Sequence, residues 1–548
     1  MTGVVGVVSS SNSLVGSSKG DAVGAESVTT LSNGNYVVES SEWNGGTGAS
    51  TWGNGSKGVR GVVSAANSFV GSANGDYVGN VSGGCVPLSN GNYLILSPNW
   101  NHRKGAATWV NGKTGIVDTI NAANSLVGSS TGDLVGESYT LLANGNYLIV
   151  SPYWNGSRGA VTLGGAAHGT VGVVSVSNSL VGSTAGDYVG GSYVYALPNG
   201  NYVVDSPSWS YGLGAVTLGN GVTGVTGQVN AADSLVGSST NDSVGSNGIR
   251  VLSNSNYIVT SIHWTNATVK DAGAVTFGNG ITGVHGSVSA ANSLVGSSTN
   301  DQIGDAGIYE FSNNNYLVIS PNWSRVSGNS NGGGFVIPNA GAVTFGSGTT
   351  GVSGLITTAN SFVGPGPLLT TPSTPFPLPN YYYYYYPQVI FDNADQTFAV
   401  TFGGQGAIFV GSQTSGIPAP TLTLFAVDPL AAKYATNSSG TPVAPTIQIV
   451  NNAGNLLSAT IQITGNYRNG QDQLVFKNTS KITGIWNAST GTLTLTGQGS
   501  AADYATALAS VNYRNLSKTP NRLTRTVSLT TADGQNVSNT VARKISFS

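Results

Sequence analysis

Short apolar runs separated by glycine, asparagine and serine recur along residues 4–364, and each run predicts a β-strand. The segment Ser138–Ser151 holds two such runs, on either side of Asn144-Gly145. Because Asn-Gly readily adopts the two left-handed conformations of a type I′ turn, this segment predicts a β-hairpin. The second run, Tyr147–Val150, is apolar at every position, which favours a strand that is buried on both faces.

The hairpin belongs to a repeat of about 55 residues. The other elements of the repeat follow in a fixed order: Asn-Ser-Leu-Val-Gly, Gly-Asp-x-Val-Gly, the hairpin, Ser-Pro-x-Trp and Gly-Ala-Val-Thr. Together they predict a unit of four antiparallel strands. The first element begins at Asn12, Asn67, Asn124, Asn178, Asp233, Asn292 and Asn360, with small changes at some copies.

Two architectures suit such repeats. A parallel β-solenoid has rungs of about 20 to 30 residues without an internal hairpin, whereas a β-propeller has four-stranded blades of about 40 to 50 residues. The strings Tyr147–Pro152 and Gly159–Leu163 resemble the successive strands of FG-GAP blades in integrin-type propellers. This resemblance, which covers residues 4–364, and the recurring hairpin predict a six-repeat β-propeller, with a β-solenoid as the alternative.

The Asn-Ser-Leu-Val-Gly element occurs seven times, but the hairpin occurs six times, so one strand is surplus. Either the copy at Asn12 closes the last blade, or the copy at Asn360 does. A surplus strand is able to pair with the open edge of a neighbouring chain, which gives a hypothesis for polymerisation. The other interpretation is that the chain boundary falls inside a blade.

The character of the chain changes after residue 364. Residues 365–387 are rich in proline and end near a run of six tyrosines, which predicts an extended linker. In residues 388–548, alternating runs such as Ala459–Thr464 predict the strands of a β-sandwich, and Ala501–Val511 predicts a short helix. The string Ile482–Gly497 resembles cadherin-like domains of bacterial adhesins, which implies a cadherin/Ig-like sandwich.

Composition excludes several classes of function. The chain of 548 residues has 8% charged residues, a net charge of −2 and no basic run, which argues against nucleic-acid binding. It has no apolar run long enough to span a membrane. The four histidines stand at non-equivalent repeat positions without an acidic or cysteine cluster, and Cys85 has no counterpart in other repeats. We therefore expect no enzyme activity, no cofactor and a buried Cys85.

The repeated aspartates and the cadherin-like region do not favour calcium binding. Each repeat supplies one aspartate, whereas calcium takes six to eight oxygen ligands, so capping of a tight turn is the preferred role. Cadherin-like domains often hold calcium with acidic clusters, but the corresponding stretch Asn451–Asn455 has no carboxylate. The repeated aspartates are Asp21, Asp76, Asp133, Asp187, Asp242 and Asp301.

Aromatic residues are the candidate partner contacts. The tryptophan of Ser-Pro-x-Trp recurs in every repeat, and packing between repeats is preferred over sugar stacking as its role. Length variation falls just after this tryptophan, most clearly at Arg325–Asn339, which makes these loops the candidate binding face. The candidate contacts are Trp43, Trp100, Trp154, Trp209, Trp264, Trp323, Tyr381, Tyr382, Tyr383, Tyr384, Tyr385 and Tyr386.

The composition, rich in Gly, Ser, Thr and Asn, resembles that of large bacterial surface proteins. The sequence therefore predicts a non-catalytic structural or adhesive protein, located outside the cell or on its surface. The chain is expected to be a fibre or biofilm-matrix subunit that assembles by strand exchange or module docking, or a segment of an adhesin. Expected partners are further copies of the chain or cell-surface glycans. The alternative is a lectin-like module that binds carbohydrate through the repeated tryptophan loops.

Overall fold

The computed structural model describes residues 6–547 except for 81–84, 328–334, 358–359, 365–387, 393–396, 403–406, 414–420, 425–431, 437, 446, 451–454 and 534–536. The chain divides into two compact units. Unit 1 comprises residues 1–310 and 347–355, and unit 2 comprises residues 311–346 and 356–548. Strands dominate both units, which confirms the all-β class.

Each repeat contributes a hairpin and a third strand. The first hairpin strands are β2 (Ser27–Thr30), β7 (Val86–Pro87), β12 (Ser138–Leu141), β17 (Tyr193–Ala196), β22 (Ile249–Val251) and β27 (Ile308–Glu310). The second hairpin strands are β3 (Tyr36–Ser40), β8 (Tyr93–Ser97), β13 (Tyr147–Ser151), β18 (Tyr202–Ser206), β23 (Tyr257–Ser261) and β28 (Tyr316–Ser320). The third strands are β4 (Ala49–Gly53), β9 (Ala106–Val110), β14 (Ala160–Gly164), β19 (Ala215–Gly219), β24 (Ala274–Gly278) and β31 (Ala342–Gly346).

Two further sets of short strands complete the sheets. The Ser-Leu-Val-type strands are β1 (Leu14–Val15), β6 (Phe69–Val70), β11 (Leu126–Val127), β16 (Leu180–Val181), β21 (Ser234–Val236), β26 (Ser293–Val295) and β33 (Ser361–Val363). The strands just before them in sequence are β5 (Gly61–Val62), β10 (Asp118–Thr119), β15 (Gly172–Val173), β20 (Gly227–Gln228), β25 (Gly286–Ser287) and β32 (Gly354–Leu355).

The predicted four-stranded antiparallel unit is confirmed, and a fifth strand joins it from the next repeat. In the third sheet the order is β12-β13-β14-β16-β20, and the last pair is parallel, with Leu180 opposite Gly227. Equivalent parallel pairs link every successive repeat of unit 1. The sequence does not predict this strand, because two residues are too few to show an alternation of apolar and polar positions.

Hydrophobic cores lie between successive sheets. One core joins Leu94 and Leu126 of the second repeat to Tyr147, Ile149 and Trp154 of the third. Other cores join the first sheet to the second, the third to the fourth and the fourth to the fifth. Both faces of an inner sheet are therefore covered, as the uniformly apolar second hairpin strands predict.

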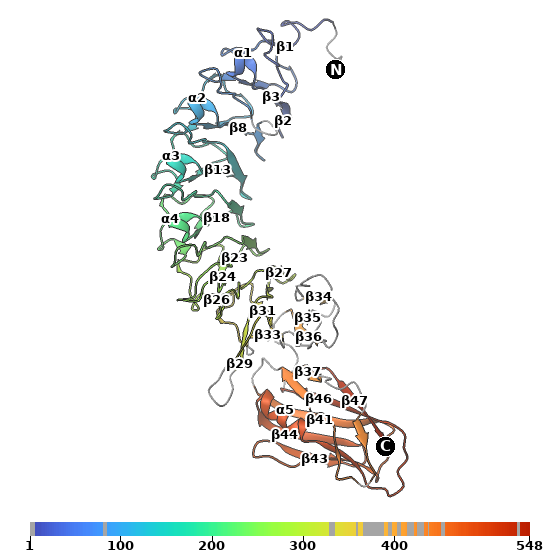
Figure 1. The fold of residues 1–548 in the computed structure, drawn as a ribbon. Coiled ribbons are helices and arrows are strands. Elements are labelled where there is room, and N and C mark those ends of the chain that lie inside the picture. Colours follow the sequence, from blue (N-terminus) through green and yellow to red (C-terminus); the bar gives the residue numbers. More distant parts are fainter. Residues whose placement is uncertain are drawn as a thin grey trace, which may run out of the picture. The chain divides into compact units, whose positions relative to one another are not determined.

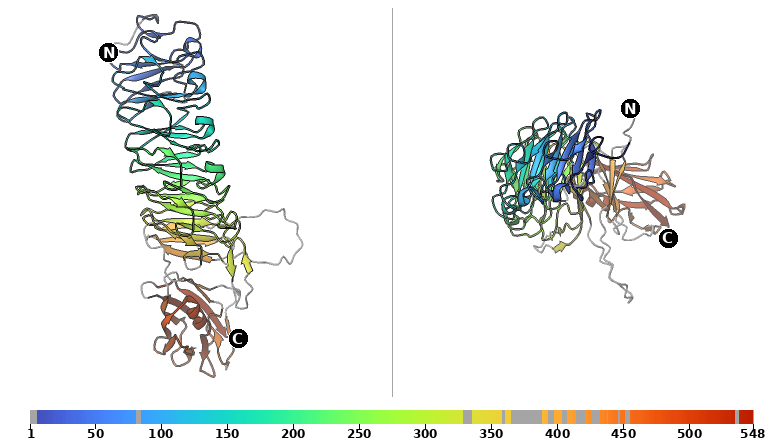
Figure 2. Two further views of the ribbon diagram at one scale, coloured as in Figure 1. Left: turned by 90° about the vertical axis from the view of Figure 1, so that its left-hand side faces the viewer. Right: turned by 90° about the horizontal axis from the view of Figure 1, so that it is seen from above.

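The first five sheets follow one another in an open stack (Figure 1; Figure 2). Each sheet contacts its neighbours through a core and a parallel strand pair, which is the one-dimensional arrangement of a solenoid. The sheets have the antiparallel strand order and the internal hairpin predicted for propeller-like blades, and within unit 1 they follow one another in an open stack. The strand at Leu14–Val15 pairs with Gly61–Val62 of the next repeat, so the hypothesis that it closes the last blade is wrong.

The hairpin loops differ from the predicted type I′ turn. In the third repeat the loop holds five residues, Leu142–Asn146, and of Asn144 and Gly145 only Gly145 has a positive φ, of 87°. The side chain of Asn144 instead accepts a hydrogen bond from the backbone N–H of Asn146 at 3.0 Å. The amides of Asn144 and Asn146 then both donate to the Gly221 carbonyl of the next repeat at 2.8 Å. The loop is therefore shaped by a contact between repeats.

Ser255 occupies the left-handed position of the fifth hairpin loop, with φ of 74°, where the first four loops have glycine. A side chain in this conformation costs about 1–2 kcal/mol, part of which is offset by the greater freedom of glycine in the unfolded chain. We expect Ser255→Gly to stabilise the chain by about 0.5–1 kcal/mol. Urea unfolding monitored by circular dichroism measures this, and Gly145→Ser is the matched control, with a loss of similar size. A loss of stability in Ser255→Gly would contradict the assignment.

The polar residues of the repeat motif also have structural roles. In the third repeat, the Thr162 and Ser179 hydroxyls form a buried hydrogen bond of 2.6 Å between the third and fourth strands. Asn178 accepts from the Ser175 N–H at 2.9 Å and donates to the Val173 carbonyl at 3.0 Å. A buried Thr–Ser pair occurs in all six repeats. These polar residues therefore recur because each one forms hydrogen bonds with a buried group or with the backbone of a turn.

Within unit 2, the segment after the linker continues the repeat pattern. Strands β34 (Gln388–Asp392), β35 (Thr397–Phe402) and β36 (Ala407–Ser412) form an antiparallel sheet. Phe398 lies opposite Gly411, as the tyrosine and glycine of other repeats do. Asn313 and Asn315 donate to the Gln413 carbonyl at 2.9 and 3.0 Å, which repeats the hairpin contact. The array therefore extends to residue 413, although sequence analysis assigned residues 388–548 to the sandwich.

Among the described residues, the C-terminal part of unit 2 has a two-stranded sheet, β37-β40, and two larger sheets, of orders β38-β47-β46-β41-β44-β43 and β39-β45-β42. The predicted helix is present as α5 (Ala501–Ala509), capped by Ser500. One core cluster includes residues of both larger sheets and of α5. The strands are β37 (Thr421–Leu424), β38 (Ala432–Tyr434), β39 (Thr441–Pro442), β40 (Ile447–Val450), β41 (Leu456–Gly465), β42 (Asp472–Val475), β43 (Thr483–Asn487), β44 (Thr492–Gly499), β45 (Asn512–Asn515), β46 (Arg525–Ala532) and β47 (Val541–Phe547).

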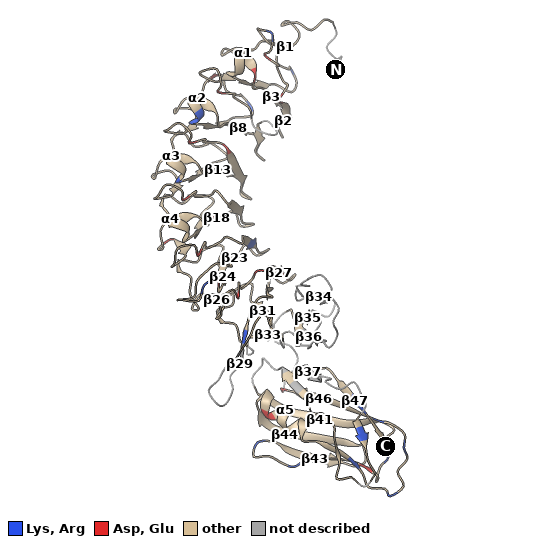
Figure 3. Ribbon diagram, in the orientation of Figure 1, with Lys and Arg blue, Asp and Glu red and all other residues tan. Residues whose placement is uncertain are grey.

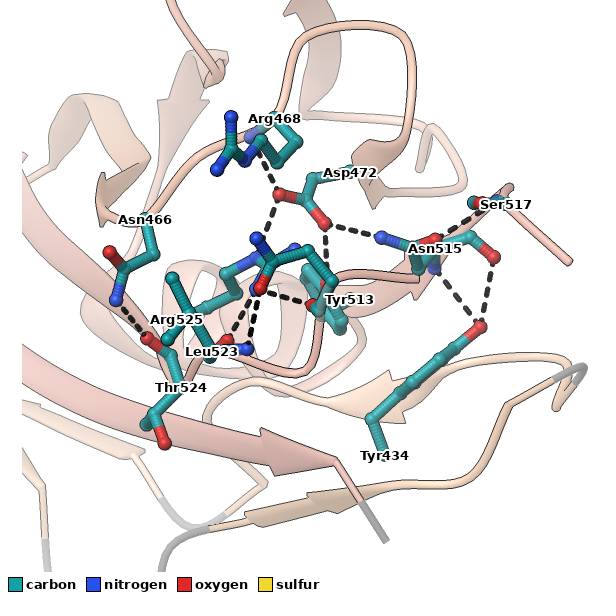
Figure 4. A network of polar contacts seen from close by, with 11 residues as sticks. Tyr434, Asn466, Arg468, Asp472, Tyr513, Asn515, Ser517, Leu523, Thr524 and Arg525 are labelled. Atoms are coloured by element: carbon teal, nitrogen blue, oxygen red, sulfur yellow. Dashed lines mark hydrogen bonds and ion pairs between the residues drawn. The ribbon is translucent and has the colours of Figure 1, made fainter. Parts of the chain in front are cut away.

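A buried ion pair anchors this domain (Figure 4). The Arg525 and Asp472 side chains are fully buried, with Nε and Oδ2 2.9 Å apart. Asp472 also accepts from the Tyr513 hydroxyl at 2.6 Å and from the Asn515 amide at 2.7 Å. Arg525 also lies 4.9 Å from the centre of the Phe547 ring. Since the buried carboxylate is paired and hydrogen-bonded, we assign this network a structural role.

Candidate binding face of the repeat array

The Ser-Pro-x-Trp loops of the first four repeats begin the short turns α1 (Trp43–Gly46), α2 (Trp100–Arg103), α3 (Trp154–Ser157) and α4 (Trp209–Gly212), which lie along one side of the stack (Figure 1). We call these turns, with the adjoining Gly-Asp-x-Val-Gly turns, the loop face. In α3, Asn155 and Gly156 have φ of 50° and 70°. Charged residues are sparse along the array (Figure 3).

The repeated aspartates cap turns on this face. Asp133 accepts hydrogen bonds through Oδ2 from the N–H groups of Ser129 and Ser130, both at 2.8 Å. Its Oδ1 accepts from the N–H of Asn155, in the loop of the following sheet, at 2.8 Å. Both carboxylate oxygens therefore accept backbone hydrogen bonds, and the carboxylate joins two repeats, which agrees with the turn-capping role that the sequence favours.

The six tryptophans pack between repeats rather than lie exposed for contact with a partner. Trp154 is 6% exposed and lies in the core between the second and third sheets. A ring in that position has no free face for a sugar or another protein, so the packing role holds and the role as a partner contact does not. The exposed fractions of the other rings are 9% for Trp43, 7% for Trp100, 3% for Trp264 and 4% for Trp323, and Trp209 is half-buried.

An open cleft lies on the loop face between the third and fourth repeats. It has a volume of about 220 Å³ and is lined by Pro152, Tyr153, Tyr188, Gly191, Ser192, Pro207 and Ser208. Tyr153 and Tyr188 are 41% and 40% exposed, and their rings meet edge to face, with centroids 6.1 Å apart. The cleft therefore combines exposed aromatic rings with hydroxyl groups and has no charged residue in its lining.

Both tyrosines occupy the variable position of a motif. Tyr153 is the x of Ser-Pro-x-Trp, and Tyr188 is the x of Gly-Asp-x-Val-Gly. The motif does not specify a residue at either position. The signal that would have found them is an aromatic residue at both variable positions of one repeat. The corresponding pairs elsewhere are Glu42 with Tyr77, Asn99 with Leu134, Ser208 with Ser243, and His263 with Gln302.

Two acidic side chains lie buried at equivalent positions of the second hairpin strands. Glu39 is fully buried, and this burial raises the pKa of its carboxyl to about 8, with a smaller contribution from Glu26. The Ser50 hydroxyl donates to Glu39 Oε1 at 2.9 Å, which opposes the rise. Burial also raises the pKa of Asp205 well above its usual value. Each carboxyl lies against a glycine of its own repeat, Gly79 or Gly245, whose missing side chain leaves room for it.

Other reactive residues do not gather into a site. Cys85 is buried and has no disulfide partner, and burial raises the pKa of its thiol. His263 pairs with Asp271 at 3.0 Å on the surface. Among the residues that the structure describes, no three His, Cys, Asp or Glu side chains form a group able to hold a metal. The same part of the chain contains no helix that is long and apolar enough to cross a membrane.

Several predicted contacts lie outside the described residues. These are the linker 365–387 with Tyr381–Tyr386, and residues 451–454 of the stretch compared with calcium sites. Of the insertion Arg325–Asn339, the ends form a hairpin, β29 (Arg325–Ser327) with β30 (Phe335–Ile337).

Comparisons with known proteins identify the repeat. No curated protein matches the chain. Two solved structures from B. thetaiotaomicron are similar, both extracellular domains of putative hybrid two-component systems. BT3049 is 11% identical over 97% of this chain and 98% of its own, with a TM-score of 0.17. BT4673 is 8% identical over 95% and 81%, with a TM-score of 0.14. These TM-scores are too low to support an argument about fold or function.

A family model described as a repeat of unknown function, DUF5650, matches seven segments, at residues 1–25, 30–80, 87–137, 141–191, 196–246, 251–305 and 310–367. The first match is partial, which agrees with the surplus strand noted in the sequence. The unit at residues 388–413 lies beyond the last match. Because the matches cover more than half of the sequence, the chain belongs to the DUF5650 repeat family.

Proposed function

We propose that this chain is a non-catalytic, extracellular structural or adhesive protein. Its repeat array serves as a scaffold that holds the loop face out for contact. The contacts expected are with further copies of the chain, as in a fibre or matrix, or with cell-surface glycans.

The proposal rests on the different roles of the recurring and the variable residues of each repeat. The recurring polar residues are used inside the array: Asp133 caps turns, Asn144 and Asn146 reach the next repeat, and Thr162 binds Ser179. Among the variable residues of the same motifs, Tyr153 and Tyr188 of the third repeat are exposed. A fixed frame with exchangeable surface residues is typical of binding solenoids.

Quartz-crystal microbalance tests this proposal with the full chain. The chain is passed over a layer of itself and over layers of bacterial cell-surface polysaccharide, with serum albumin as the reference protein. We expect adsorption that exceeds the reference on at least one of the two kinds of layer. Adsorption no greater than that of albumin on both would contradict a structural or adhesive role.

Carbohydrate binding is the second candidate function. The version based on the six tryptophans is not supported, because five of them are buried and Trp209 is half-buried. The observation that favours carbohydrate is the uncharged, tyrosine-lined cleft between the third and fourth repeats.

A further inference from the structure

Backbone hydrogen bonds hold the segments that carry the two tyrosines of the cleft between the third and fourth repeats. The Tyr153 carbonyl accepts from the Ser157 N–H at 2.9 Å, and the Tyr188 N–H donates to the Ser157 carbonyl at 3.0 Å. The two aromatic residues are therefore held by the same residue of α3. Tyr188 also has a positive φ of 46°, which sets the direction of its Cα–Cβ bond. A binding site whose backbone is already ordered loses less conformational entropy when it is filled.

The floor of the cleft depends on a missing side chain. Gly191 donates to the Tyr188 carbonyl at 2.7 Å. A Cβ at this position would lie 2.8 Å from the Tyr188 carbonyl oxygen and 3.3 Å from Pro152 Cβ. Glycine therefore keeps the space between Pro152 and Tyr188 open. The volume of about 220 Å³ is smaller than the roughly 300–1,000 Å³ of typical drug-sized pockets, so the cleft suits one ring of a longer ligand.

The residues that line the cleft suit a neutral ligand that has both an apolar face and polar groups. The rings of Tyr153 and Tyr188 offer apolar surface, and the Ser208 hydroxyl is able to exchange hydrogen bonds with hydroxyl groups. No lining residue is charged. Arg158, close in sequence, donates to the backbone carbonyls of Ser183 and Asn155 instead. A sugar ring has this combination, with apolar C–H faces and a rim of hydroxyls.

We propose that this cleft is a subsite for one residue of a neutral polysaccharide, which stacks on the tyrosine pair. The inference rests on the proposed adhesive function and names the ligand class and its contacts. The other repeats lack the paired tyrosines, so the chain holds this subsite at the third repeat only, within the described residues. Binding through a single small subsite is expected to be weak and to gain strength on multivalent surfaces.

Isothermal titration calorimetry of the full chain tests the proposal. The probes are cellohexaose, maltohexaose, mannohexaose and chitohexaose, with a polygalacturonate oligomer as the anionic control and decaproline as the peptide control. We expect binding of at least one neutral probe and about tenfold or greater weakening in the double variant Tyr153→Ala with Tyr188→Ala. Tyr139→Ala is the matched control, because Tyr139 is also 40% exposed but is absent from the cleft lining; it should bind as the natural chain does.

Three results would overturn the proposal. They are no binding of any neutral probe, equal binding by the double variant, and tyrosine-dependent binding of decaproline or polygalacturonate alone. Circular dichroism of the double variant shows that a loss of binding is not a loss of folding. If the saccharide probes fail while the chain still adsorbs to a layer of itself, the subsite is wrong and the structural role stands.

Discussion

Replacing Trp154 by alanine is expected to destabilise the third repeat by about 3–5 kcal/mol. The ring is 6% exposed and fills the core between the second and third sheets, so its removal leaves a cavity that the stacked sheets cannot close. In a stacked array, such a loss acts on the repeat and its neighbours. Amide hydrogen exchange across residues 138–181 measures it, because local opening of this repeat is then distinguished from unfolding elsewhere.

Trp154→Phe is the matched variant. It keeps an aromatic ring in the core, and the indole N–H that it removes has no hydrogen-bond partner among the described residues. We expect a loss of about 1–2 kcal/mol, clearly smaller than that of alanine. Equal protection in Trp154→Ala and in the natural chain would mean that the tryptophans are not core residues. The packing role assigned to all six rings would then fail.

The stability of the first repeats should fall as pH rises from about 4.5 to about 8. Glu39 is fully buried, with a folded-state pKa of about 8 against an ordinary value of 4.5. Between these values the folded chain keeps a proton that the unfolded chain releases, so unfolding becomes easier with each pH unit and levels off above pH 8. The shift corresponds to at most about 5 kcal/mol. Asp205 contributes in the same direction in the fourth repeat.

Glu39→Gln removes the titrating group and keeps a similar shape. The variant is expected to be more stable than the natural chain at pH 8 and to match it more closely near pH 4.5. Hydrogen exchange of residues 27–70 at several pH values, corrected for intrinsic exchange rates, measures the difference. Glu42→Gln, which alters an exposed carboxyl, is the control. A natural chain whose first repeats become more stable from pH 5 to pH 8 would contradict the account.

The sequence predicted the repeat unit well because its signals are local. The uniformly apolar Tyr147–Val150 indicated a strand buried on both faces, and the structure places cores on both sides of it. The role of the aspartates as turn caps followed from their number per repeat, and Asp133 confirms it. The helix Ala501–Ala509 was visible as an uninterrupted run of helix-forming residues.

The missed features depend on contacts between repeats. The choice between ring and open stack is decided by two-residue parallel pairs such as Leu180 with Gly227, which leave no periodic trace. The unit at residues 388–413 lacks the residues of the sequence motif, and its contact to Asn313 and the Phe398–Gly411 pair reveal it. The cleft was missed because Tyr153 and Tyr188 are far apart in the sequence and meet only through the turn at Ser157.

Electron microscopy of the full chain, with light scattering alongside, tests the central claim most directly. That claim is that the first five repeats, in unit 1, form an open stack rather than a closed ring. We expect particles in which this part of the chain is an open stack of sheets, either single or joined into longer assemblies. A closed ring of blades around a central channel would contradict it, because the loop face and the parallel links between repeats would then be arranged differently.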